Sequence, residues 1–132
     1  MTATPSNEAW RQLRLRYELG AHTADTYHDA GFAVVLQDVV IGDVLTDYVA
    51  AIRSTPLVVV VLVPRPEVVA SRELRRDKVA YREDFNTIVE LDAGLREATP
   101  RIGLWLDTSD QSADETVDEI IERAMDDGVV AS

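Results

Sequence analysis

Apolar residues recur at steps of three and four through the first part of the chain. This stripe consists of Trp10, Leu13, Tyr17, Ala21 and Ala24. Such spacing is typical of a helix with one buried face. Thr4 followed by Pro5 is typical of a helix start, with Thr4 as the N-cap and Pro5 at the first helical position. We therefore predict a helix over residues 5–30, ended by Gly31.

Three later segments are short, uninterrupted apolar runs, at residues 32–36, 57–63 and 102–106. They are rich in valine, isoleucine and leucine and show no polar alternation. Strands with this pattern are usually covered on both faces, as in parallel sheets. The pattern predicts three buried parallel strands.

Further helical patterns separate these runs. Asp43 can cap a short helix, Pro66 can open another, and residues 83–97 form a third. Ser112 and Glu115 have the spacing of a capping box for the last helix. The residues expected to face inward on the third and the last of these helices are Phe85, Ile88, Leu91, Leu95, Val117, Ile120, Ile121, Ala124 and Met125.

Alternation of helices with apolar strands indicates an α/β fold, in which a parallel sheet lies between two layers of helices. A chain of 132 residues favours a single α/β domain spanning 1–132, with three strands and about five helices. No internal repeat or low-complexity linker divides it.

Composition narrows the classes of function. The net charge of −11 argues against nucleic-acid binding, which needs a basic surface. No apolar run is long enough for a membrane span, and cysteine is absent. These features lead us to expect a cytoplasmic protein.

The charge is uneven, with a basic segment that comprises Arg65, Arg72, Arg75, Arg76, Lys78 and Arg82, and an acidic last helix. The segment favours a small anionic ligand, and the alternative is an ordinary solvated helix face.

Polar residues follow each predicted strand, where ligands bind in open parallel sheets. The first strand ends in Asp38, which could hold Mg²⁺ or orient an attacking hydroxyl. The alternative is a helix cap or a hydrogen-bond acceptor. Arg72 and Arg76 lie four residues apart on one helix face, with Arg75 beside them, and could bind phosphate oxygens. The alternative is a solvated face paired with Glu73 and Asp77.

In this order, three stretches resemble the chloramphenicol phosphotransferase-like branch of the P-loop kinases. Residues 34–42 (VVLQDVVIG) are similar to the strand and Walker-B-like turn of that family. Residues 60–78 (around PRPEVVASRE) are similar to its strand and arginine-bearing lid helix. Residues 103–109 (GLWLDTS) and 115–120 (ETVDEI) are similar to its last strand, adenine-side loop and closing helix.

The resemblance implies a role for each matching residue. Asp38 would be the Walker-B-like acid and the Mg²⁺ contact, although Gln37 stands where the family can show a second acid. Arg72 and Arg76 would contact ATP phosphates, assisted by Arg75, and Thr108 with Ser109 would flank the adenine. ATP and Mg²⁺ are the cofactors implied, and a small molecule with a hydroxyl group is the acceptor. Acceptor binding could involve a set on the first helix, namely Arg11, Arg14 and Tyr17.

One departure is large, because no G-x-x-x-x-G-K-[ST] loop occurs in the sequence. The chain corresponds to the C-terminal two-thirds of such a kinase, and we expect it to be inactive alone. The family places its missing first strand between the segments at 32–37 and 57–63. We therefore predict that these segments pair directly, or that a partner chain or upstream polypeptide fills the gap. The alternative function is a non-catalytic interaction or dimerisation module that forms a homo-oligomer through this unpaired sheet edge.

Overall fold

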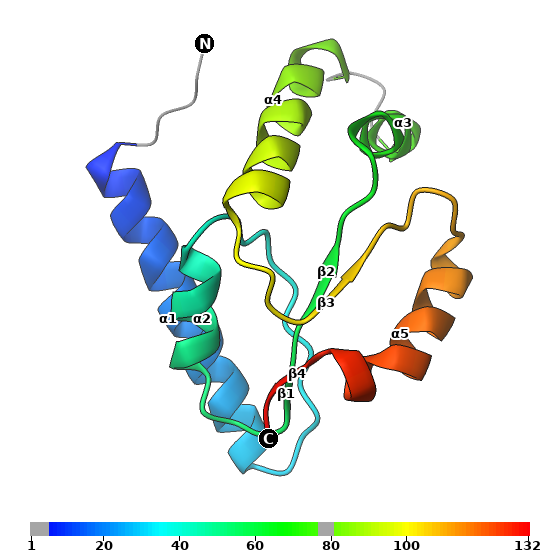
Figure 1. Ribbon diagram of the computed structural model, residues 1–132. Helices are drawn as coiled ribbons and strands as arrows, with labels where there is room; N and C mark the ends of the chain where they lie inside the picture. The colour runs from blue at the N-terminus through cyan, green and yellow to red at the C-terminus, as the bar shows by residue number, and fades with distance from the viewer. Residues whose placement is uncertain (1–5, 77–80) are drawn as a thin grey trace.

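The computed structural model describes residues 6–76 and 81–132, with side chains described for residues 6–73 and 85–132. Helices dominate, and the strands are short (Figure 1). The elements in chain order are α1 (Asn7–Asp29), α2 (Val44–Ala51), β1 (Leu57–Val58), β2 (Val60–Leu62), α3 (Pro66–Arg76), α4 (Tyr81–Ala93), the π-helical turn η1 (Gly94–Ala98), β3 (Leu104–Leu106), α5 (Ala113–Asp127) and β4 (Val129–Ala131).

The first helix packs against α2 through its predicted apolar stripe. Tyr17 and Ala21 are buried with Tyr48 of α2, and the two tyrosine rings lie 4.9 Å apart. Ser6 caps α1, because its side chain accepts a hydrogen bond from the Ala9 N–H. Thr4 and Pro5, the predicted start of this helix, lie outside the described residues. The stripe loses contact toward the N-terminal end of the helix, where Trp10 is exposed.

The strands form two small pairs. β2 and β3 are parallel, with Val60 opposite Leu104 and Leu62 opposite Leu106. This pair confirms the predicted parallel arrangement of segments 57–63 and 102–106. β1 pairs antiparallel with β4, which the sequence pattern did not predict. The fold class is α/β, as predicted, but the described strands form two two-stranded sheets instead of one three-stranded sheet.

The predicted strand at residues 32–36 is wrong. The segment is extended, but it joins no sheet in the described chain. Val35 is 93% exposed, and no hydrogen bond among the described residues joins this segment to strand 57–62. The predicted direct pairing of the two segments is therefore also wrong. An apolar run becomes a strand only when a neighbouring strand supplies hydrogen bonds, and none of the described strands pairs with this run.

The helices after β2 and β3 begin where the sequence predicts. Pro66 opens α3, and the Ser112–Glu115 capping box opens α5. The predicted inward face of α5 is partly wrong, because three of its five members are exposed: Val117, Ile121 and Met125. In the helix predicted at 83–97, Leu91 is also exposed, and the helix changes to π geometry at Gly94.

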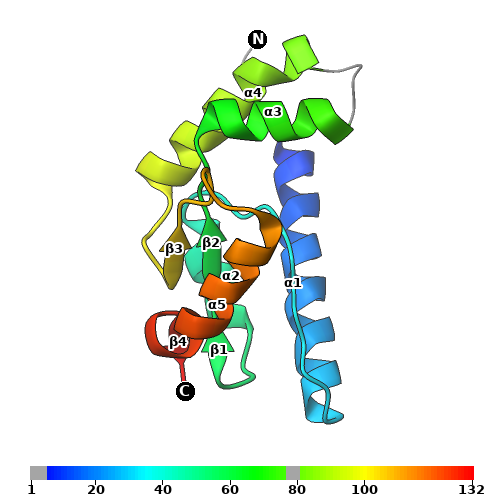
Figure 2. The same ribbon diagram turned by 90° about the vertical axis from the view of Figure 1, so that its right-hand side faces the viewer.

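Figures 1 and 2 show how the helices are arranged around the strands. In Figure 1, α1 and α2 lie on one side of the strands and α5 lies on the other. In Figure 2, β3 and β4 lie on one side of β1 and β2, and the extended trace that follows α1 lies on the other side. None of the described helices combines the length and the apolar character that crossing a membrane requires.

Candidate functional site

The loops at the carboxyl ends of β2 and β3 are held together by hydrogen bonds. The backbone N–H of Val63 donates to the carbonyl of Leu106 at 2.8 Å. One step further, the Arg65 N–H donates to the Ser109 hydroxyl oxygen, also at 2.8 Å. Open parallel sheets bind their ligands at this end of the strands. It is also where the chain places three arginines, Arg65, Arg72 and Arg96.

Arg72 joins α3 to the loop after β3. Its guanidinium donates to the Thr108 carbonyl at 2.7 Å, to the Thr108 hydroxyl at 3.3 Å and to the Gln111 carbonyl at 3.4 Å. All of these acceptors are uncharged, and the described residues provide no carboxylate partner for Arg72. The guanidinium is thus held in place while its positive charge stays available to an anion.

Arg96 is a member of this site that sequence reasoning missed. It lies in η1 and donates to the carbonyls of Val63 at 2.8 Å and Pro64 at 3.1 Å, at the end of β2. Asp92, one turn earlier, accepts from its Nε atom at 2.8 Å. The only sequence signal was an Asp–Arg pair four residues apart, which is common on solvated helix faces.

Arg65 differs from Arg72 because it is neutralised locally. Glu67 accepts from its Nε atom at 2.9 Å, and Asp110 lies 3.5 Å from another guanidinium nitrogen. In the same loop, Asp107 accepts hydrogen bonds from the hydroxyl and the backbone N–H of Ser109. These bonds, first of all the hydroxyl bond, lower the pKa of the Asp107 carboxyl, and Arg65 and Arg96 act in the same direction.

The residues predicted to flank adenine make internal contacts. Thr108 is 3% exposed and holds Arg72, so it positions the arginine more directly than it could meet a ligand. The Ser109 hydroxyl is shared between Asp107 and the Arg65 backbone. Of the other predicted phosphate contacts, Arg75 and Arg76 lie outside the residues whose side chains are described.

Asp38 makes its contacts elsewhere. Its carboxylate accepts from Arg16 of α1 at 2.8 Å and from the Val39 N–H at 2.7 Å. Within residues 6–73 and 85–132, no three potential metal-ligating side chains of His, Asp or Glu gather in one place. A single carboxylate already paired with an arginine does not fit a Mg²⁺ ion held by protein ligands alone.

A hollow of about 600 Å³ lies between α1 and the start of α2. Among its lining residues are Trp10, Arg11, Arg14 and Asp43. Arg11 is paired with Glu8 through two hydrogen bonds, at 3.0 and 2.9 Å. Tyr17 is absent from the hollow, because it is buried and donates its hydroxyl to the Val39 carbonyl. Two of the three residues proposed for acceptor binding thus line a common surface.

Comparison with protein-family models, with curated proteins and with solved structures finds no match to this chain.

Proposed function

We propose that this chain is the lid and adenine-side part of an ATP-dependent small-molecule phosphotransferase similar to the chloramphenicol phosphotransferase-like kinases. The observation that carries the proposal is the position of Arg72. It stands beside the carboxyl ends of two parallel strands, held by neutral acceptors and with no described carboxylate to neutralise it. In the proposed family, this position belongs to a lid arginine that contacts ATP phosphates.

Phosphoryl transfer from ATP to a hydroxyl concentrates negative charge on the oxygens of the migrating group. Fixed cations lower the barrier because they stabilise this charge without first having to be ordered. Arg72 is held by the loop after β3, and Arg96 is held by the end of β2. In our proposal, Arg72 contacts the phosphates, and Arg96 holds the carboxyl end of β2 in position.

The proposed activity of the chain as given is phosphate binding, not turnover. The backbone amides and lysine of a G-x-x-x-x-G-K loop are absent from the sequence. Loss of even one donor to the reacting centre costs about 10²-fold or more in rate. No step through Mg²⁺ is assigned, since Asp38 is paired with Arg16.

The test is a calorimetric titration of the chain with ATP, ADP and inorganic tripolyphosphate. Arg72→Gln keeps an N–H donor for the loop carbonyls but removes the charge, and it should abolish binding. Arg101→Gln is the matched control, because Arg101 precedes β3 and lies over the Trp105 ring, 4.4 Å from its centroid. Absence of heat with all three ligands up to several millimolar, or equal binding by both variants, would refute the proposal.

A second candidate function is a non-catalytic interaction or dimerisation module. The observation that favours it is the amount of apolar surface left exposed, above all Val35 and Ile121. Apolar patches of this kind mark interaction sites in soluble proteins. Light scattering across a range of protein concentrations tests self-association, and a constant monomer mass would remove the dimer form of this candidate.

A further inference from the structure

Strand 57–62 has one paired edge and one open edge. The Val59 N–H donates to the Gly128 carbonyl at 2.9 Å, and the Val59 carbonyl accepts from the Leu104 N–H at 2.9 Å. Val59 thus turns both backbone groups toward β4 and β3. Because successive residues of a strand point their backbone groups to opposite sides, those of Val58, Val60 and Leu62 point the other way. No described residue outside the strand pairs with them, so they form an open row of donors and acceptors.

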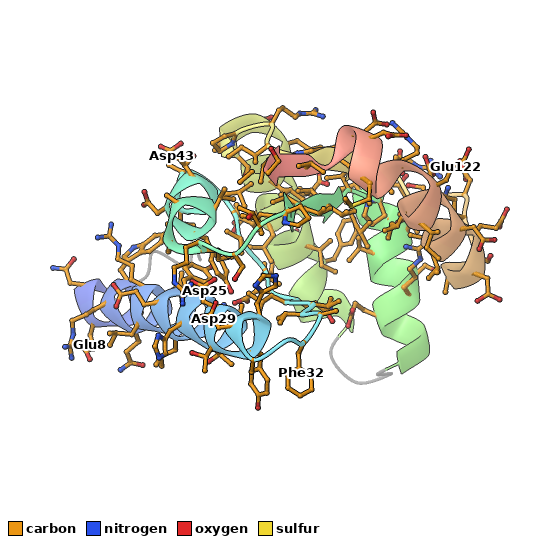
Figure 3. All side chains as sticks on the ribbon, turned by 90° about the horizontal axis from the view of Figure 1, so that it is seen from below. Glu8, Asp25, Asp29, Phe32, Asp43 and Glu122 are labelled. Atoms are coloured by element: carbon orange, nitrogen blue, oxygen red, sulfur yellow. The ribbon has the colours of Figure 1, made fainter. Side chains whose placement is uncertain are left out.

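The extended segment at 33–37 lies on that same open side (Figure 2). Its backbone makes no hydrogen bond to another described residue. Its apolar side chains are exposed, and Val35 is almost completely so. Just before this segment, the Phe32 ring points away from the body of the molecule (Figure 3).

Helix α5 adds a second exposed apolar surface. Val117, Ile121 and Met125 are spaced four residues apart, so they share one face of the helix, and all three are exposed. In Figure 2, α5 crosses in front of the region between β2 and the extended segment, and Figure 1 places α1 and α2 behind it. The open edge therefore has a helix layer on each face.

We propose that this edge is the docking site for one apolar β-strand of a separate polypeptide, which pairs with strand 57–62 and packs under α5. Only an extended backbone can satisfy the alternating donors and acceptors of Val58, Val60 and Leu62. This proposal gives the interaction module, our second candidate function, a specific kind of partner. It does not depend on nucleotide binding.

Charge identifies the chemistry of this occupant. Segments 33–36 and 57–62 contain no charged residue, so the core of the docked strand is uncharged. The rest of α5 is strongly acidic, with Asp114, Glu115, Asp118, Glu119, Glu122, Asp126 and Asp127. A strand with basic flanks therefore matches its surroundings. A second copy of this chain does not, because each copy carries a net charge of −11.

The probe is a short synthetic peptide with a valine and isoleucine core and lysine flanks. Its control has the same sequence with alternate backbone nitrogens methylated, which keeps the charge and apolar area but removes one row of donors. Amide exchange followed by NMR supplies the direct readout. Addition of the first peptide should protect Val58, Val60 and Leu62 while Val59 and Val63 stay protected throughout, and the methylated peptide should leave the exchange unchanged.

Substitutions locate the site. Val35→Lys and Ile121→Lys should each weaken peptide binding about tenfold or more, because an apolar contact becomes a charge that must lose water. Leu19→Lys is the matched control, since Leu19 is 65% exposed and lies between Tyr17 and Ala21 in sequence, which puts it on the face of α1 opposite to the one that packs on α2. The proposal is overturned by equal binding of the methylated peptide, by no binding of either peptide, or by a dimer in which the three amides are already protected. A monomer that binds neither peptide removes this inference and leaves the ATP titration unaffected.

Discussion

The guanidinium of Arg72 donates to the carbonyl of Thr108 across 2.7 Å and thereby joins α3 to the loop after β3. Arg72→Ala should lower the free energy of unfolding by about 1.5–3 kcal/mol, since hydrogen bonds from a charged donor to partly buried carbonyls are lost. Urea denaturation measures this change. Arg11→Ala removes an exposed arginine paired with Glu8 and should have a much smaller effect, because solvent screens an exposed ion pair. Equal effects of the two substitutions would contradict the assigned role of Arg72.

Asp25 connects α1 to the loop after α2. Its carboxylate is buried and accepts from the Ser54 hydroxyl, the Ser54 N–H and the Arg53 N–H. The hydroxyl bond is the main cause that lowers the pKa of Asp25, and burial opposes it. A lowered pKa in the folded state means that the unfolded chain takes up the proton first. Asp25 therefore stabilises the fold above about pH 4, its ordinary pKa, and the stabilisation is lost as the pH falls further.

Asp25→Asn should reduce stability at neutral pH and flatten its decline below about pH 4. Thermal unfolding between neutral pH and pH 3 measures both effects. Asp118→Asn, which removes an exposed carboxyl group from α5, is the matched control and should leave the stability at neutral pH nearly unchanged. An Asp25→Asn profile parallel to that of the unaltered protein would show that Asp25 has no part in the acid dependence.

Features specified by neighbouring residues were predictable from the sequence. The capping box of Ser112 and Glu115 and the start of α3 at Pro66 depend only on contacts within one helical turn. The parallel pairing of β2 with β3 was predictable because both runs are apolar throughout. Arg65 and Ser109 each follow a predicted strand, and this position predicted that they lie at the same end of the sheet.

Features that depend on distant partners were not predictable. The run at 32–36 has strand composition, but a strand also needs a hydrogen-bonded neighbour, and no described segment provides one. The exposed face of α5 has the same physical origin, because an apolar stripe is buried only when something lies beneath it. β4 is too short to show a period, and the bonds of Arg96 to Val63 and Pro64 span more than thirty residues.

Tyr17 holds the connection between the extended segment and α2 against α1, because its hydroxyl donates to the Val39 carbonyl at 2.9 Å. Tyr17→Phe should cost about 1 kcal/mol of stability and speed amide exchange in residues 38–41. Tyr27→Phe is the control, since Tyr27 is exposed, its ring packs edge-to-face on Phe32, and its hydroxyl makes no hydrogen bond to another described residue. Urea denaturation and hydrogen exchange are the measurements, and identical behaviour of the two variants would exclude a specific role for the Tyr17 hydroxyl.

Gly103 is needed where β3 begins, for two reasons that a single substitution tests together. Its φ of +83° lies in the region that L residues rarely adopt, and a Cβ there would lie 2.3 Å from the Val59 carbonyl oxygen. Gly103→Ala must therefore strain the backbone and push β3 away from β2. We expect a loss of about 3 kcal/mol or more, measured by urea denaturation.

Gly31 provides the matched comparison. Its φ is +95°, but a Cβ there would meet no atom within 4 Å. Gly31→Ala therefore carries the conformational cost alone, about 1–2 kcal/mol. The difference between the two variants measures the close approach of β3 to Val59. If both alanine variants lose the same stability, the close contact contributes nothing, and β3 can shift along β2 without cost. If Gly103→Ala loses more, the close approach of Gly103 to Val59 fixes the position of β3 against β2.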